Sequence, residues 1–173
     1  YSIASLGEDV KARTVVVNGT SKSFAMTGWR IGYLACDALL ARHISTLQDH
    51  STSNPCSISQ VAAETALRND LSAFIAEKCA EFQSRRDLVL KLLCNSPKVR
   101  PFEPRGAFYV FSDISSTGMR SMEFALRLLM EKKVAVIPGG PFGEDGYIRL
   151  SFATGKETIE KGISRINDFL KGI

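Results

Sequence analysis

The sequence predicts an α/β protein in two parts, and three observations lead to this expectation. Residues 14–17 form a β-branched run of the kind that is buried on both faces of a parallel sheet. Further strand-like runs alternate with segments whose apolar residues recur at helical spacing. Near residue 70 the pattern changes, from two strands and a helix to a long helix followed by strands and helices. We therefore place one part at residues 1–70 and the other at residues 71–173.

The first part contains four more elements after its β-branched run. They are a strand over 29–35, a helix over 37–49, a loop over 51–55 and a helix over 57–67. The first of these helices carries Leu40, Ile44 and Leu47 at helical spacing, which predicts a buried face. Pro55 marks the loop, because a proline disfavours the helical conformation of the residue before it.

The second part begins with a long helix over residues 71–94, for which Asn69 and Asp70 offer an N-cap. The apolar residues of this helix lie largely on one stripe: Leu71, Phe74, Ile75, Cys79, Phe82, Val89, Leu92 and Leu93. Three strands are expected after it, over residues 107–113, 134–137 and 147–152. The second part is therefore expected to mix helices and strands.

Two shorter helices complete the second part. One lies between the first two of these strands, and four apolar residues share a face of it: Met122, Ala125, Leu126 and Leu129. The other follows the last strand, and Thr154 and Glu157 predict a capping box at its start. Its buried face is predicted by alternating steps of four and three: Ile159, Ile163, Ile166 and Leu170.

The composition is that of an ordinary soluble globular protein. Apolar residues make up 45% of the chain and charged residues 23%. The net charge of +4 is small and Lys and Arg form no long run, which argues against nucleic-acid binding. No apolar stretch approaches the length of a membrane span. Because the chain begins at Tyr1 without a methionine, we expect it to be a fragment.

The cysteines and histidines do not form a metal-binding pattern. Cys36, Cys56, Cys79 and Cys94 contain no CxxC pair, and the chain has only two histidines. Because a structural zinc ion needs about four such ligands at close spacing, we expect no metal site. Four reduced thiols in a cytoplasmic protein are the simpler interpretation.

The most informative feature of the chain is Lys22, which stands eight positions before Arg30 and between two apolar segments. A lysine amine that leaves solvent can lose its proton and condense with an aldehyde to form a Schiff base. An arginine close by can clamp a phosphate through its planar fork. Pyridoxal phosphate is a phosphorylated aldehyde that needs both groups. The simpler alternatives are a surface lysine beside a turn and an ion pair at a strand edge.

The residues around Lys22 resemble the lysine-attachment segment of the class I/II aminotransferases, and residues 24–33 resemble the aspartate and prephenate branch. The matching positions are Gly19, Ser21, Gly28, Arg30 and Gly32. The resemblance implies the fold of the fold type I enzymes that use pyridoxal phosphate. Residues 1–70 would then be the end of the large cofactor-binding domain, with its mostly parallel sheet. Residues 71–173 would be the small α+β C-terminal domain.

The resemblance also implies roles for single residues. Lys22 would hold the cofactor and move a proton during transamination, and Arg30 would bind the cofactor phosphate with help from the Ser21 hydroxyl. Arg149 lies in the middle of an apolar strand, where a charge is costly unless an anion meets it. In the family this arginine takes the substrate α-carboxylate, whereas a buried structural salt bridge is the alternative. Phe108 matches a phenylalanine that lines the substrate pocket, although it could equally be a core residue.

The function implied by the resemblance is amino transfer between an amino acid and a 2-oxo acid, with aspartate or glutamate as candidate donors. The intact protein would be a homodimer. The family's other cofactor contacts precede this segment, so the fragment alone is expected to be inactive. Two alternatives stay open: a lyase or synthase on the same scaffold, and an aminotransferase-like sensory domain of a transcription regulator. Release of ammonia and pyruvate from a cysteine conjugate would indicate the lyase, and an upstream DNA-binding segment would indicate the regulator.

Overall fold

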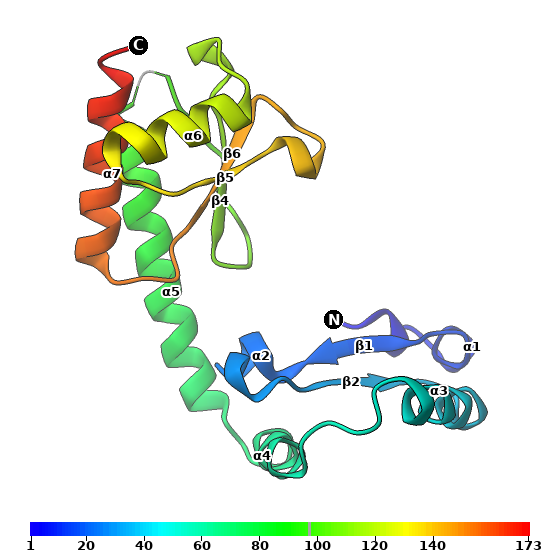
Figure 1. The fold of residues 1–173 in the computed structure, drawn as a ribbon. Coiled ribbons are helices and arrows are strands. Elements are labelled where there is room, and N and C mark those ends of the chain that lie inside the picture. The colour runs from blue at the N-terminus through cyan, green and yellow to red at the C-terminus, as the bar shows by residue number, and fades with distance from the viewer. Residues whose placement is uncertain (97) are drawn as a thin grey trace. The chain divides into compact units, whose positions relative to one another are not determined.

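The computed structural model describes residues 1–96 and 98–173, which form two compact units (Figure 1). Unit 1 comprises Tyr1–Ala76 and unit 2 comprises Glu77–Ile173. Helix α5 (Ser72–Leu93) contains the division between them. The Asp70 carboxylate accepts a hydrogen bond from the backbone N–H of Ser72 at 3.0 Å, which is the capping role predicted for this position. No helix within the described ranges is both long and apolar enough to cross a membrane.

Unit 1 is built around a two-stranded hairpin. Its elements before α5 are η1 (Ile3–Ser5), α1 (Glu8–Ala12), β1 (Val16–Gly19), α2 (Thr20–Ser23), η2 (Thr27–Trp29), β2 (Gly32–Ala35), α3 (Ala38–Ser51) and α4 (Ser57–Arg68). Strands β1 and β2 pair antiparallel, with Val16 opposite Ala35 and Gly19 opposite Gly32. The backbone N–H of Thr20 donates to the carbonyl of Ile31 at 3.3 Å, so the two ends of the β1–β2 connection lie side by side. The chain therefore returns antiparallel.

This hairpin corrects the expectation drawn from residues 14–17. The strand begins two residues later than expected, and its pairing is antiparallel rather than parallel. It is not buried on both faces, because the Val17 side chain is 77% exposed. The predicted strand over 29–35 is shorter as well, since its first residue belongs to the 3-10 helix η2.

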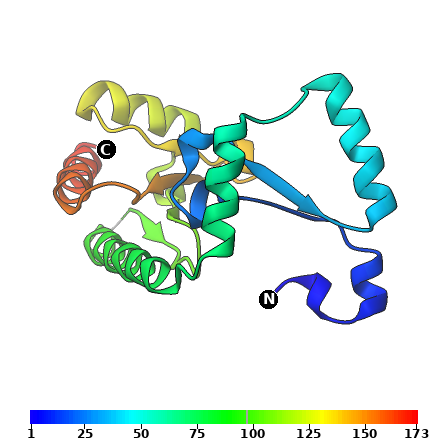
Figure 2. The ribbon, with the colours of Figure 1, turned by 90° about the horizontal axis from the view of Figure 1, so that it is seen from below.

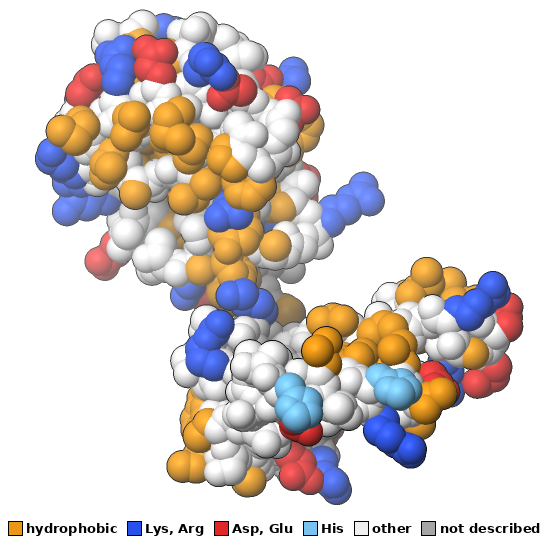
Figure 3. All heavy atoms as spheres, turned by 45° about the vertical axis from the view of Figure 1, so that its right-hand side comes forward, with side chains coloured by type: hydrophobic (Ala, Val, Ile, Leu, Met, Phe, Trp, Pro, Cys, Tyr) orange, Lys and Arg blue, Asp and Glu red, His pale blue; other side chains and the backbone are white. Residues whose placement is uncertain are grey.

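The hydrophobic core of unit 1 is small. Its buried members are Met26, Ile31 and Ala63, with Phe24, Ala62 and Ala66 packed against them. The face predicted to be buried on α3 is largely exposed instead, with Leu47 at 70%. Figure 3 shows hydrophobic side chains gathered on the surface of the molecule. Helical periodicity predicted the apolar face of α3 correctly, but no described element of the unit covers it.

Unit 2 is a four-stranded antiparallel sheet with helices on one face. Beyond α5 its elements are β3 (Arg100–Pro101), β4 (Tyr109–Asp113), η3 (Ser115–Thr117), α6 (Ser121–Lys132), β5 (Ile137–Pro138), η4 (Gly140–Phe142), β6 (Tyr147–Ser151) and α7 (Lys156–Leu170). The strand order is β3-β4-β6-β5. Strands β4 and β6 pair along their whole length, with Phe111 opposite Arg149 and Val110 opposite Leu150. Of the predicted strand over 134–137, only Ile137 belongs to β5.

The core of unit 2 lies between this sheet and helices α5, α6 and α7 (Figures 1 and 2). Val110 and Ile148 point into it from the central strands, and both are fully buried. The predicted face of α7 is confirmed, because all four of its residues are buried: Ile159, Ile163, Ile166 and Leu170. Because side chains alternate along a strand, Phe111 and Arg149 point to the opposite face of the sheet.

Two details of the helices differ from the sequence-based expectation. Helix α6 buries Phe124 and Leu128, together with Ser121 and Ala125, whereas three of the four residues predicted for its face are exposed. Both sets have helical spacing, so periodicity alone could not show which face is buried. The face that is buried includes Phe124, whose ring contacts that of Phe169 on α7. Helix α7 begins after Gly155 and has no side-chain cap, so the predicted capping box is wrong.

Candidate active site

The connection between β1 and β2 carries Lys22 on a single turn of helix, α2. This turn is anchored by Thr20, which is fully buried and whose hydroxyl donates to the Ile31 carbonyl at 3.4 Å. The close approach suits Gly19, because a Cβ there would lie 3.3 Å from the same carbonyl oxygen, which is a tight contact. The Lys22 side chain itself is exposed. The amine is therefore presented from a turn that the hairpin holds in place.

The same connection carries Ser21 and Arg30. The Thr27 hydroxyl donates to the carbonyl of Ser21 at 3.4 Å, and the Thr27 carbonyl accepts from Arg30 Nη1 at 3.0 Å. Arg30 has a left-handed backbone with φ of 56°, which is uncommon outside glycine and costs free energy. No carboxylate of the described ranges pairs with its guanidinium. One connection thus holds an amine, a hydroxyl and a guanidinium.

Arg149 lies in the middle of β6, on the face of the sheet away from the core. Its guanidinium carbon lies 4.2 Å from the centre of the Tyr109 ring and 4.8 Å from that of Phe142. In residues 1–96 and 98–173 no carboxylate pairs with it and no hydrogen bond from its guanidinium is recorded. The structural salt bridge considered from the sequence is therefore not found there. Two aromatic rings stabilise this half-buried charge instead.

The surroundings of Arg149 are aromatic. Phe111 stacks on Tyr147 with ring centres 5.0 Å apart, and its ring meets that of Phe142 edge-on at 6.3 Å. Tyr147 also lies 6.1 Å from Phe102. Sequence reasoning missed these residues, although the alternation along β4 and β6 could have indicated them once the register was known.

Phe108 precedes β4 and packs against the core of unit 2. Its ring lies 5.9 Å from that of Phe82 on α5 and 4.6 Å from that of Tyr109. The structure thus brings Phe108 beside a residue that contacts Arg149. Its role as a wall of a substrate pocket stays a prediction.

A hydrogen-bond network fixes the loop that carries Phe142. The Asp145 carboxylate accepts bonds from the Ser121 hydroxyl at 2.6 Å and from Arg120 Nε at 2.5 Å. The Ser121 oxygen in turn accepts from the backbone N–H of Gly140 at 3.1 Å. The hydrogen bond from Ser121, followed by that from Arg120, holds the pKa of Asp145 below its usual value. The start of α6 and the segment before β6 are thereby tied together.

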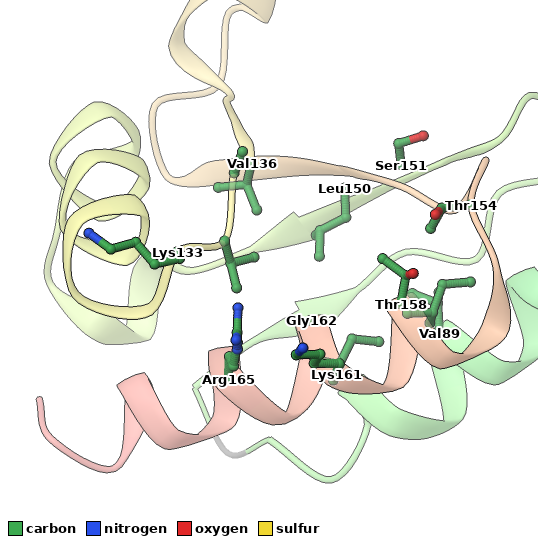
Figure 4. A pocket seen from close by; sticks show the side chains of 14 residues that line it. Val89, Lys133, Val136, Leu150, Ser151, Thr154, Thr158, Lys161, Gly162 and Arg165 are labelled. Atoms are coloured by element: carbon green, nitrogen blue, oxygen red, sulfur yellow. The ribbon is translucent and has the colours of Figure 1, made fainter.

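A cavity of about 360 Å³ lies in unit 2 on the other side of the sheet from Arg149 (Figure 4). Leu150, which points away from Arg149, lines it together with Val136 and residues of α7. In Figure 4 the Arg165 side chain rises from α7 toward the segment that carries Val136. None of the site residues predicted from the sequence lines this cavity, so it plays no part in the candidate site.

Comparisons with known proteins agree with the resemblance. The chain is 44% identical over 176 residues to an aspartate aminotransferase of Bacillus sp. (strain YM-2), covering 99% of this chain and 45% of that protein. It is 42% identical to a probable aspartate/prephenate aminotransferase of Rickettsia bellii, over 96% of this chain and 44% of the relative. The chain therefore spans less than half the length of these relatives.

Solved structures give the same result. The aromatic aminotransferase of Pyrococcus horikoshii OT3 superposes with a TM-score of 0.92 at 39% identity, over 99% of this chain and 46% of the other. The aspartate aminotransferase of Rhizobium meliloti superposes with a TM-score of 0.91 at 36% identity, over 98% and 45%. These neighbours confirm the predicted fold type. The family model of the class I and II aminotransferases matches residues 1–166, and this chain belongs to that family.

Proposed function

We propose that the protein containing this chain is a pyridoxal-phosphate-dependent aminotransferase that acts between an amino acid and a 2-oxo acid. The observation that carries the proposal is the connection with Lys22, Ser21 and Arg30, in a chain that belongs to the aminotransferase family. Arg149 adds support, because it is a guanidinium held in place by rings and not by a carboxylate of the described residues. In this proposal residues 1–70 are the end of the large domain and residues 71–173 the small domain.

The residues of the β1–β2 connection fit pyridoxal phosphate in their chemistry. The cofactor needs an amine for its aldehyde and hydrogen-bond donors for a phosphate dianion. Lys22 supplies the amine, while Arg30 and Ser21 supply the donors, and Arg30 is not neutralised by a described carboxylate. When bound, the cofactor supplies an electron sink for the charge that develops on the substrate α-carbon.

Each of these side chains has one task in the proposed reaction. Lys22 would hold the cofactor through its side-chain amine, and the same amine would serve as the base for the proton of the substrate α-carbon. Arg30 and Ser21 bind the phosphate oxygens and keep the cofactor in register with Lys22. Arg149 binds the α-carboxylate of the substrate through its planar fork, which orients the α-carbon. Phe108 lines the substrate pocket.

The substrates we propose are aspartate or glutamate, with 2-oxoglutarate or oxaloacetate as the acceptor. The names of the relatives support this choice, since they include aspartate, aspartate/prephenate and aromatic-amino-acid aminotransferases. We further propose that the intact protein is a homodimer in the cytoplasm. The four cysteines support the location, because they are all unpaired thiols.

The test is borohydride reduction of the full-length holoprotein, followed by peptide mapping. Reduction fixes the cofactor to the amine that holds it, and we expect the label on Lys22. The matched variant Lys22→Arg keeps the charge and should take up no label. A label on another lysine would refute the assignment.

A donor panel then tests the reaction class. Aspartate or glutamate should be converted only when a 2-oxo acid is present, because the amino group must be passed on. Release of ammonia and pyruvate from a cysteine conjugate without an acceptor would indicate a lyase instead.

A further inference from the structure

The guanidinium of Arg149 contacts two aromatic rings that come from different parts of unit 2. Tyr109 belongs to β4, the strand next to β6, and its ring lies 4.2 Å from the guanidinium carbon. Phe142 comes from η4, outside the sheet, and lies at 4.8 Å. Rings attract a cation without accepting the N–H hydrogen bonds of the guanidinium in the way an anion does, so these donors stay available to an anion.

Phe142 needs a support of its own, because its side chain is 51% exposed and it lies on a short loop. The loop is folded tightly on Gly139, whose carbonyl accepts from the N–H groups of Phe142 at 2.7 Å and Glu144 at 3.2 Å. Gly139 leaves no room for a side chain, since a Cβ would lie 2.3 Å from the Glu144 carbonyl oxygen.

The second support is the network of Ser121 and Asp145. Ser121 is almost fully buried, and its hydroxyl group bridges the Asp145 carboxylate to the N–H of Gly140, the residue two positions before Phe142. The N–H of Ser121 also donates to the Asp145 carbonyl at 2.8 Å. The loop is therefore attached at both ends to the start of α6. A loop attached in this way holds the Phe142 ring at a fixed place.

We propose that Phe142 is a positioning residue for Arg149, held in place through Ser121 and Asp145. This inference rests on the proposed function, in which Arg149 binds the substrate carboxylate. The ring of Phe142, 4.8 Å from the guanidinium carbon, limits the movement of the Arg149 side chain. Less orientational freedom is then lost when the substrate binds, so the loop contributes to substrate affinity without touching the reacting atoms.

Chemical modification of the full-length protein tests the geometry without any turnover. Phenylglyoxal reacts with accessible guanidinium groups, and the extent of reaction at Arg149 can be followed by peptide mass spectrometry. We expect Phe142→Leu to speed the modification of Arg149 about threefold or more, because one covering ring is lost. Phe142→Tyr keeps the ring and should leave the rate unchanged. An equal rate in Phe142→Leu and the parent protein would overturn the inference.

Steady-state kinetics of the holoenzyme test the consequence for the reaction. Phe142→Leu should raise KM for the amino acid about 3- to 10-fold and change kcat less than about twofold, since ground-state binding is what is lost. Ser121→Ala should also raise KM for the amino acid. Phe142→Tyr, which keeps the ring, should have the KM of the parent protein. The matched control is Phe102→Leu. Phe102 is 52% exposed, close to the value for Phe142, and its ring contacts a different arginine, Arg100.

The two proposals fail in different ways. If Arg149→Met leaves kcat/KM unchanged, the proposed role of Arg149 is wrong, although the modification test still reports on Phe142. If Arg149→Met lowers kcat/KM but Phe142→Leu leaves KM unchanged, the role of Arg149 stands and the positioning inference is overturned. A rise in KM in Phe102→Leu equal to that in Phe142→Leu would also overturn it.

Discussion

Arg149→Met separates a binding arginine from a structural one, because the two roles predict different stabilities. The substitution removes two contacts between a cation and a ring, each worth about 0.5–1 kcal/mol at exposed sites. No carboxylate of the described residues loses its partner, and the methionine keeps an apolar stem on the strand. The expected loss in the free energy of unfolding of unit 2 is therefore about 1–2 kcal/mol or less. Breaking a buried ion pair would instead cost about 3–5 kcal/mol.

The effect of Arg149→Met on activity should be much larger than its effect on stability. A two-pronged bond to a carboxylate consists of two charge-assisted hydrogen bonds, each worth about 1.5–3 kcal/mol. Their combined loss predicts a fall in kcat/KM of about 100-fold or more. Arg149→Lys keeps the charge but not the planar fork, so its kcat/KM should lie between that of the parent protein and that of Arg149→Met.

The assay combines hydrogen exchange and kinetics on the intact protein. Exchange of the Ile148 amide, in the buried core beside Arg149, reports the free energy of unfolding of unit 2 locally. The reasoning is refuted if Arg149→Met lowers the free energy of unfolding reported by this amide by more than about 3 kcal/mol, the value for a broken buried ion pair. Unchanged kcat/KM would refute the binding role.

Four further predictions concern unit 2 and can be read from hydrogen exchange of its core amides. Gly139→Ala should destabilise the unit by about 1–3 kcal/mol through overpacking, whereas Gly162→Ala, with open space in the middle of α7, should stabilise it by about 0.5–1 kcal/mol. Phe124→Ala should cost about 3–5 kcal/mol, because the ring is fully buried. The hydrogen bonds from Ser121 and Arg120 lower the pKa of Asp145 in the folded state, so the stability that they add is full above the unfolded pKa and is lost as the pH falls through the folded pKa. Asp145→Asn should therefore show a weaker loss of stability with acid than the parent protein, and an identical acid dependence would contradict this.

Local patterns predicted the parts of the fold that depend on local interactions. The buried face of α7 follows from the spacing of four isoleucine and leucine residues, since a helix with one apolar stripe has only one way to face a core. The N-terminus of α5 follows from Asp70, because a carboxylate there satisfies a backbone N–H. Both predictions depend on residues within about one helical turn or on a single repeating stripe.

The predictions that failed depend on contacts between distant residues. The antiparallel pairing of β1 and β2 follows from the hydrogen bond between Thr20 and Ile31, which a strand pattern does not contain. Helix α6 is apolar on two faces, and the face it buries is decided by its contact with Phe169 on α7. The two faces of α6 are similarly apolar, so only tertiary packing determines which one is buried.

The residues of the candidate site also differ in whether they depend on local sequence or on contacts between distant segments. Lys22, Ser21 and Arg30 lie within nine residues of one another, so a local motif was enough to propose them. Phe142 could not be found in this way, because it meets Arg149 through a loop that Ser121 and Asp145 close across 24 residues. The residues that hold a functional group in place are often supplied by distant segments, whereas the group itself is marked by its immediate neighbours.

The two units also differ in the size of the hydrophobic core beside their candidate site residues. Of the described residues, unit 2 buries a continuous core of aliphatic and aromatic side chains, and the sheet that carries Arg149 rests on it. Unit 1 buries three apolar residues and leaves the apolar face of α3 exposed, although its connection carries Lys22. Exposed apolar faces of this kind are covered in stable proteins. Substitutions at Arg149 can therefore be interpreted against the packed core of unit 2, whereas the connection that carries Lys22 has only a small core beside it.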